Sequence, residues 1–222
     1  MVLSAAAAFI TFSLFGLGGD TVNFDNLKPL SFPPFWTATA SRAPETSRWE
    51  VLRDATAPSR PNVLVKEAGR ANDSEFSMAV FDKANCRDGD LSVKFRIEAG
   101  PHRVKTAGLV WRYQDQKNYY LLHFSVEEKN IVLFRVENGQ AHAIPITGAK
   151  SGAFGVPHDL HIREWYVAKV IFRGRNIKVL FGNRQLFEAV DDSLPNAGKT
   201  GLWTRGATQA SFDDFRIDKK GN

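Results

Sequence analysis

The chain has 222 residues, a length that suits one sizeable domain. Hydrophobic residues make up 43% of it and include 17 Phe and 5 Trp, which is enough to bury a full core. The formal net charge is +5, but Lys and Arg are spread along the chain, with no run longer than Lys219-Lys220. A nucleic-acid-binding protein would cluster these charges, so we predict no nucleic-acid partner, whereas an anionic polysaccharide stays open. The single cysteine, Cys86, excludes a disulfide within the chain, and no Cys/His cluster has the spacing of a zinc site.

An apolar run at the N-terminus extends from Val2 to Leu17 and ends in small residues before Asp20. This pattern is typical of a secretory signal peptide, so we predict that residues 1–20 are a signal peptide and that the protein is secreted, periplasmic or on the cell surface. The positive charges that usually precede such a run are missing, and the competing interpretation is a buried first helix. A spanning helix needs about 20 apolar residues, so we predict no stable membrane span after processing.

The rest of the chain, residues 21–222, reads as a single all-β domain. Short runs of β-branched, aromatic and aliphatic residues alternate with Pro, Gly, Asn and Asp, which predicts many short strands and no helix. In chain order we expect strands at residues 21–27, 35–39, 49–52, 62–67, 76–81, 89–99, at three places within 106–136, and at 140–146, 164–172, 176–181, 185–189, 201–204 and 210–218. Residues 148–158 are predicted to form a Gly-rich loop. Turns every 8–12 residues are typical of a β-sandwich or barrel.

Residues 106–136 carry the clearest pattern. Polar breaks at 114–118 and 127–130 divide them into three runs, which predicts a three-stranded antiparallel meander. Asn138-Gly139 follows, and this pair favours the tight turn of a hairpin because both central positions need positive φ. Upstream, Leu91 to Ile97 alternates apolar and polar residues, which indicates a strand with one face in water.

Several phrases resemble a known group of domains. They are WEVLRDATAPSRPNVLV, AGLVWRYQDQKNYYLLHF, VLFRVENGQ, LFEAVDDSLPNAGKTGLWT and FDDFRI, in this order. The chain resembles the concanavalin A-like lectin/glucanase superfamily over about residues 21–218. Within it, the chain is most similar to bacterial laminin-G-like domains, labelled family-sixteen-glycosidase-like or 3-keto-disaccharide hydrolase domains. The resemblance implies a concanavalin A-like jelly-roll sandwich of two antiparallel sheets, one of them concave, with a groove that commonly holds sugars.

A catalytic carboxylate pair is not evident in the sequence. Retaining glycosidases use two carboxylates about 5–5.5 Å apart, and true family-sixteen glucanases carry them in a Glu-x-Asp-x-x-Glu phrase that is absent here. The nearest acidic pairs are Glu127-Glu128, Asp191-Asp192 and Asp213-Asp214, and neighbouring residues on a strand point to opposite faces. We therefore predict no catalytic residues, and whether the protein is an enzyme stays open.

A sugar-binding site requires no catalytic carboxylate pair, only an aromatic face and a few fixed polar groups. Strand alternation splits the aromatic runs into two faces. One face, expected to fill the core, holds Leu109, Trp111, Leu122, Phe124 and Leu202. The other face, expected to be exposed as a carbohydrate-binding surface if its strands are neighbours, holds Arg112, Tyr119, His123, Trp203 and Arg205. The alternatives are core packing for each aromatic and a pairing of Arg112 with Asp115.

Metal sites are a further possibility. The resemblance implies a possible structural calcium ion near the paired terminal strands, for which Asp25, Asp213 and Asp214 are the candidate ligands. No cofactor is otherwise certain. His158 and His161 have a spacing that metal sites use on helices, but they lie between a loop and a strand, and we interpret them as solvated side chains.

Three functions remain after these observations. The first is an exported, non-catalytic carbohydrate-binding module with a sugar groove on the concave sheet. The second is a glycoside hydrolase or lyase that acts on (3-keto) disaccharides or a polysaccharide. The third is a structural envelope domain without a small ligand, which a groove covered by residues 148–158 would favour.

Overall fold

The computed structural model describes residues 19–41, 48–69, 71–98, 103–148 and 154–221, and all its regular elements are strands. No helix in these ranges is long and apolar enough to cross a membrane. The predicted signal peptide falls outside the described residues except for its last two positions.

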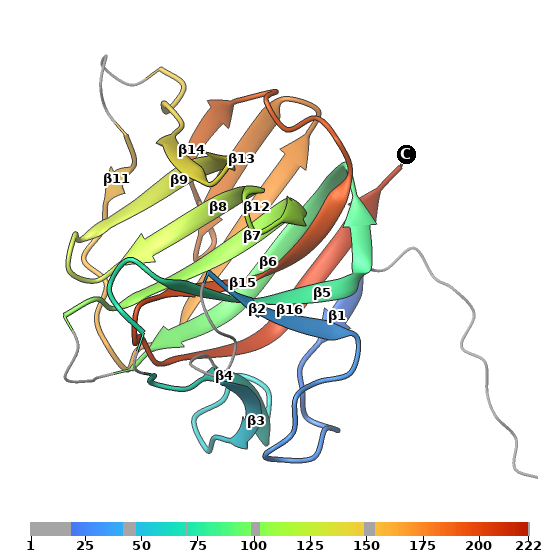
Figure 1. The fold of residues 1–222 in the computed structure, drawn as a ribbon, viewed down its shortest axis with the longest axis vertical. Coiled ribbons are helices and arrows are strands. Elements are labelled where there is room, and N and C mark those ends of the chain that lie inside the picture. Colours follow the sequence, from blue (N-terminus) through green and yellow to red (C-terminus); the bar gives the residue numbers. More distant parts are fainter. Residues whose placement is uncertain (1–18, 42–47, 70, 99–102, 149–153, 222) are drawn as a thin grey trace, which may run out of the picture.

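The described strands form two antiparallel sheets, as the resemblance in the sequence implies, and each sheet has eight strands (Figure 1). Sheet A has the order β14-β13-β12-β6-β16-β4-β3, and β1 also pairs with β16. Its strands are β1 (Asp20–Val22), β3 (Trp49–Arg53), β4 (Asn62–Lys66), β6 (Asp88–Ile97), β12 (Tyr166–Arg173), β13 (Asn176–Phe181), β14 (Arg184–Val190) and β16 (Ala210–Lys220). In Figure 1 the β3–β4 hairpin lies at the lower end of the molecule and β13–β14 at the upper end.

Sheet B has the order β10-β9-β8-β7-β15-β5-β2, and β11 pairs with the start of β9. Its strands are β2 (Trp36–Ala40), β5 (Phe76–Cys86), β7 (Thr106–Asp115), β8 (Asn118–Ser125), β9 (Asn130–Glu137), β10 (Gln140–Ala143), β11 (Val156–Pro157) and β15 (Gly198–Arg205). Strands β7, β8 and β9 are the predicted meander, side by side and antiparallel. The Asn138-Gly139 turn also forms, with φ of 51° and 82°, and joins β9 to β10.

The core lies between the two sheets, and the alternation of the strands builds it. Leu91 and Phe95 of β6 are fully buried, while Lys94 and Arg96 between and beyond them keep contact with solvent. The five residues assigned to the core by alternation each have 0% exposure; they are Leu109, Trp111, Leu122, Phe124 and Leu202. Trp111 stacks on Tyr120, with ring centroids 5.4 Å apart.

Two local expectations were wrong. The predicted first strand, residues 21–27, ends at Val22, because Phe24 turns the chain with a φ of 64°. The predicted loop 148–158 contains β11, which two backbone pairings attach to β9. Isolated pairings of this length leave no periodic signal in a sequence.

Sheet B is apolar on its outer face as well as on its core face. A second cluster of buried apolar residues covers that outer face, and it consists of Met78, Val80, Val110, Tyr119, Leu121, Val136 and Trp203. A strand buried on both faces reads as a continuous apolar run, which describes β7 and β8. An apolar outer face of this kind leaves a surface on which a ligand could pack.

Candidate functional site

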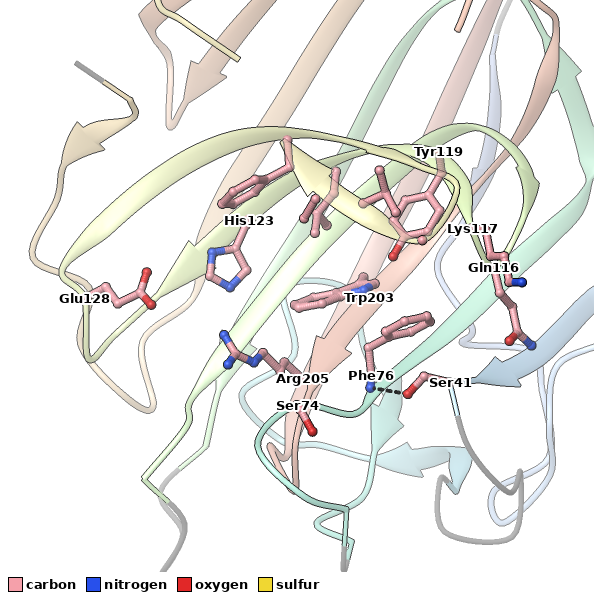
Figure 2. Close-up of a pocket in the computed structure, with 15 residues that line it drawn as sticks. Ser41, Ser74, Phe76, Gln116, Lys117, Tyr119, His123, Glu128, Trp203 and Arg205 are labelled. Atoms are coloured by element: carbon pink, nitrogen blue, oxygen red, sulfur yellow. Dashed lines mark hydrogen bonds between the residues drawn. The ribbon is translucent and has the colours of Figure 1, made fainter. Parts of the chain in front are cut away.

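A groove of about 440 Å³ lies on the outer face of sheet B (Figure 2). Strands β5, β8, β9, β10 and β15 supply most of its walls and floor. The described residues that line it are Ser41, Ser74, Phe76, Gln116, Lys117, Tyr119, Leu121, His123, Glu128, Phe134, Val136, Gly139, Ala141, Trp203 and Arg205. Four of the five residues expected to form a carbohydrate-binding surface are among them; only Arg112 is not.

Strand order explains why the four residues meet. Strand β7 lies between β15 and β8, and in this three-strand row Trp203 is opposite Gly108, which is opposite His123. Because Gly108 has no side chain, the two rings approach across it, with centroids 5.4 Å apart and an interplanar angle of 79°. A Cβ at Gly108 would stand 2.6 Å from Leu121 Cδ1 and 3.0 Å from the Leu122 carbonyl oxygen, so a larger residue would require Leu121 to move.

The aromatic residues of the groove floor are less exposed than alternation predicts. Tyr119, His123 and Trp203 have exposures of only 2%, 4% and 6%. Phe76 is stacked beside Trp203, with centroids 6.4 Å apart, and Phe134 meets the His123 ring edge-on at 5.9 Å. The expectation that these three side chains are exposed was therefore wrong, because aromatic neighbours from β5 and β9 cover them.

Burial also sets the ionisation of the floor. Desolvation, helped by the charge of Arg205, lowers the pKa of His123 to about 4, so the imidazole is neutral near neutral pH. Its Nδ1 is buried and has no hydrogen-bond partner among the described residues. Burial raises the pKa of the Tyr119 hydroxyl. The floor is thus uncharged, with two buried polar atoms that lack a partner among the described residues, His123 Nδ1 and Trp203 Nε1.

Polar and half-buried aromatic residues surround this floor, and of these the sequence analysis assigned only Arg205 to a binding surface. Figure 2 shows Gln116 and Lys117 beyond Tyr119 at one end of the groove, with Glu128 and Arg205 near His123 at the other. Phe76 and Phe134 are half-buried side chains of the walls. Alternation along β5 and β9 was the available signal for these two, whereas the polar residues lie at strand ends or in turns, where spacing says nothing about direction.

Arg112 does not belong to the groove, and its predicted place there was wrong. The pairing of β7 with β8 shifts register between Trp111 and Asp115, and Arg112 adopts a φ of 47°. This bulge turns the side chain away from the groove, because an extra residue reverses the alternation. The guanidinium is 1% exposed and donates to three backbone carbonyl oxygens, those of Arg87 (2.8 Å), Gly174 (2.6 Å) and Leu194 (3.1 Å).

Of the three aspartates proposed as calcium ligands, two have carboxylates that lie close together and the third contacts a lysine instead. The Ser59 hydroxyl donates to Asp25 Oδ2 at 2.8 Å, and the Ser59 backbone N–H donates to Asp213 Oδ2 at 2.7 Å, so these two carboxylates converge. Asp214 lies within the register shift between Asp213 and Arg216, and its carboxylate pairs with Lys94 at 2.7 Å and not with Ser59.

The pair of carboxylates fits a calcium ion in the chemistry of its oxygens. Asn62 beside them is 2% exposed, and its Oδ1 accepts no hydrogen bond from any described residue. Asp25, Asp213 and Asn62 would therefore be the side chains to hold the ion, which takes six to eight oxygen ligands. No group of three or more His, Cys, Asp or Glu residues with the arrangement of a metal site occurs in the described ranges.

The remaining candidates from the sequence are not part of the groove, apart from Glu128. His158 packs edge-on against Phe181, with centroids 4.6 Å apart, while His161 lies 4.0 Å from Asp159. Asp191 accepts hydrogen bonds from the Tyr120 hydroxyl and from Arg135. Among the described residues that line the groove, Glu128 is the only carboxylate.

Comparisons with known proteins identify the fold. No protein-family model matches the chain, and no curated protein matches it. Among solved structures, the chain is similar to the carbohydrate-binding module CBM66 from Bacillus subtilis, with a TM-score of 0.60, 20% identity, and coverage of 82% of this chain and 93% of that one. It is also similar to the Bacillus licheniformis β-glucanase, with a TM-score of 0.57, 9% identity, and coverage of 91% and 99%.

A lichenase from a mouse hindgut metagenome, a β-1,3-1,4-glucanase, is similar as well, with a TM-score of 0.55, 10% identity, and coverage of 91% and 100%. Identities this low show the fold alone. The chain is thus a concanavalin A-like jelly roll, as the resemblance in its sequence implies.

Proposed function

We propose that this chain is an exported carbohydrate-binding module that holds a glycan in the groove of sheet B. The observation that carries the proposal is the composition of the groove, an aromatic floor and walls with polar groups at both ends. Sugar rings have apolar C–H faces that pack on aromatic side chains, and hydroxyl groups that need a few fixed polar partners. The groove offers both kinds of contact in one place.

Binding without hydrolysis is supported by the charges in the groove. A retaining glycosidase needs two carboxylates about 5–5.5 Å apart, and the described lining contains only Glu128. Residues 148 and 154–158, the described parts of the segment that could have covered the groove, contribute nothing to its lining. Among the described residues this supports ligand binding over a purely structural envelope domain.

The structure indicates which variants test this proposal best. Trp203 belongs to the apolar cluster of sheet B, so truncating it would disturb the fold as well as the groove. Phe76 and Phe134 pack against that cluster but are only partly buried, and both line the groove. Phe154, which is 51% exposed and outside the groove, supplies a matched control.

The experiment is a binding screen against a panel of neutral and acidic polysaccharides, by affinity electrophoresis and then calorimetry. We expect Phe76→Ala and Phe134→Ala to weaken binding roughly tenfold, because each removes aromatic contact surface, and Phe154→Ala to bind like the wild type. Binding of no glycan, or equal losses in all three variants, would overturn the proposal. Release of reducing sugar from a bound polysaccharide would establish hydrolysis instead.

Export rests on a separate observation, the apolar run before Asp20. Fractionation of cells that express the full chain, with a C-terminal tag for detection, tests this part. We expect the protein outside the cytoplasm and shortened near residue 20. A full-length protein that stays in the cytoplasm would contradict it.

A further inference from the structure

The charges of the groove are unequal, and neither of its two cations forms an ion pair with a described carboxylate. Lys117 and Arg205 line the groove together with a single described carboxylate, that of Glu128. The Arg205 side chain donates through Nε to the backbone carbonyl of Asp73, and no described carboxylate lies within ion-pair distance of it. Arg205 also lines a neighbouring hollow with Glu127 and Glu128, but Glu127 pairs with Lys105. The backbone carbonyl that Arg205 contacts does not neutralise its guanidinium.

The residues around Arg205 leave its charge as the one that a ligand at this end of the groove would meet. Arg205 and His123 line the same end of the groove, and the charge of Arg205 adds to burial in lowering the pKa of the imidazole. Figure 2 shows the guanidinium below the His123 ring at the edge of the aromatic floor. Since His123 is neutral and Trp203 is apolar, Arg205 is the cation at this end of the floor. A ligand seated on the floor would remove water from the guanidinium.

Removing water from an unpaired cation is unfavourable unless the ligand supplies compensation. A neutral sugar offers only hydroxyl groups, whereas a carboxylate or sulfate offers a charge-assisted, two-pronged pairing with a guanidinium. We propose that the glycan held in this groove is anionic, and that its carboxylate or sulfate group pairs with Arg205. This inference rests on the proposed function and adds the chemical class of the ligand.

The opposite end of the groove agrees with this. Lys117 lies beyond Tyr119, on the other side of Trp203 from Arg205 (Figure 2). A cation at each end of an aromatic floor suits an oligosaccharide that carries anionic groups on separate sugar units. The net charge of +5 adds an attraction at long range, which salt weakens. The negative charge of Glu128 repels an anionic ligand. Neutralising Glu128 should therefore strengthen binding, the opposite of the effect expected for neutralising Arg205.

The experiment compares ligands that differ only in charge. Dextran sulfate is compared with dextran, and polygalacturonate with its methyl ester, by calorimetry at fixed ionic strength. We expect the full chain to bind at least one charged member roughly tenfold more tightly than its neutral counterpart. Preference for sulfate or for carboxylate identifies the source of the charge, and either result supports the inference.

Three variants assign the effect to the groove. We expect Arg205→Gln to weaken binding of the anionic ligand roughly tenfold to a hundredfold and Glu128→Gln to strengthen it. Arg216→Gln is the matched control, since Arg216 is exposed on β16 of sheet A and its loss changes the net charge equally. We expect this control to stay within about twofold of the wild type.

Two results would count against the inference, and they are distinguishable. If neutral glycans bind as tightly as anionic ones, or Arg205→Gln behaves like Arg216→Gln, the anionic ligand is wrong while carbohydrate binding in the groove stands. If no glycan of either charge binds, both proposals fall. Unfolding curves of each variant confirm that differences in binding do not reflect loss of the fold.

Discussion

Trp203 and His123 contact each other across a strand to which neither of them belongs. Trp203 lies on β15 and His123 on β8, yet their ring centroids are 5.4 Å apart. The contact is possible because Gly108 of the intervening β7 leaves open the space that a side chain would fill. The floor of the groove thus depends on one glycine.

Gly108→Ala tests that dependence. The added Cβ would stand 2.6 Å from Leu121 Cδ1 and 3.0 Å from the Leu122 carbonyl oxygen, which forces the sheet or the groove floor to shift. We expect the free energy of unfolding to fall by about 1–3 kcal/mol, as for other overpacked sites, and glycan binding to weaken. Urea unfolding measures the first effect. Gly221→Ala, with nothing within 4 Å, is the control, and equal stabilities of the two variants would contradict the packing described.

Arg112 is expected to act on stability and not on binding. Its guanidinium satisfies backbone carbonyls from three separate loops and lies over the Tyr120 and Phe172 rings. We expect Arg112→Met to lower the free energy of unfolding by about 2–4 kcal/mol, because buried acceptors lose their donor. Arg112→Lys should also be destabilised, since a lysine cannot reproduce the planar set of donors. Reduced glycan affinity in a variant of unchanged stability would contradict this role.

Because of Lys66, the free energy of unfolding of the protein depends on pH in the alkaline range. The side chain is 0% exposed on β4, and burial lowers its pKa from 10.5 to about 8. Between these values the unfolded chain binds the proton more tightly than the folded one, so the native state gains stability as pH rises through this window. We expect wild type to gain up to about 3 kcal/mol over Lys66→Met from pH 8 to pH 10.5.

Urea titrations across that range measure the difference between the two proteins. Lys178, which is 42% exposed in its side chain, provides the control variant Lys178→Met. A wild-type curve that runs parallel to the Lys66→Met curve would show that the buried ammonium does not titrate as described.

Asp213 produces the opposite dependence in acid. Burial, together with the charges of Asp214 and Asp25, raises its pKa from 3.8 to about 6. The folded state therefore holds this proton more tightly, and the stability that it contributes below pH 3.8 is lost as pH rises through 6. In a chelating buffer we expect wild type to lose about 1–3 kcal/mol relative to Asp213→Asn over this interval. If the difference in free energy of unfolding between wild type and Asp213→Asn did not change with pH, the raised pKa of Asp213 would be contradicted.

Calcium binding provides a second test of the same two carboxylates, Asp25 and Asp213. A cation between Asp25 and Asp213 would relieve the repulsion that helps to raise the pKa of Asp213. We expect calcium near neutral pH to raise the melting temperature of wild type, and to raise that of Asp213→Asn much less. Asp214→Asn is the control, because Asp214 pairs with Lys94. Identical responses of wild type and Asp213→Asn would exclude the site.

Much of the fold follows from short-range pattern. The meander of β7, β8 and β9, the Asn138-Gly139 turn and the core position of Trp111 were all predicted. Each depends on alternation or on turn chemistry within a few residues, so neighbouring positions in the sequence are enough to predict it. Shorter elements escaped prediction, as β11 did, because two backbone pairings need no periodic sequence.

The groove was predictable only in part, for a geometric reason. Alternation placed Tyr119, His123, Trp203 and Arg205 on one face, and the pairing of β15 and β8 with β7 brought them together. The same rule failed for Arg112, because a bulge that depends on the partner strands reversed its direction.

The sequence by itself therefore determined the strands and most of their faces, since side-chain direction along a regular strand follows from the backbone alone. Only the tertiary structure decided how deeply the aromatic floor is covered and which cation faces it. Those features depend on side chains from strands distant in the sequence, on a glycine that lets two rings meet, and on one bulge that removes an arginine from the groove.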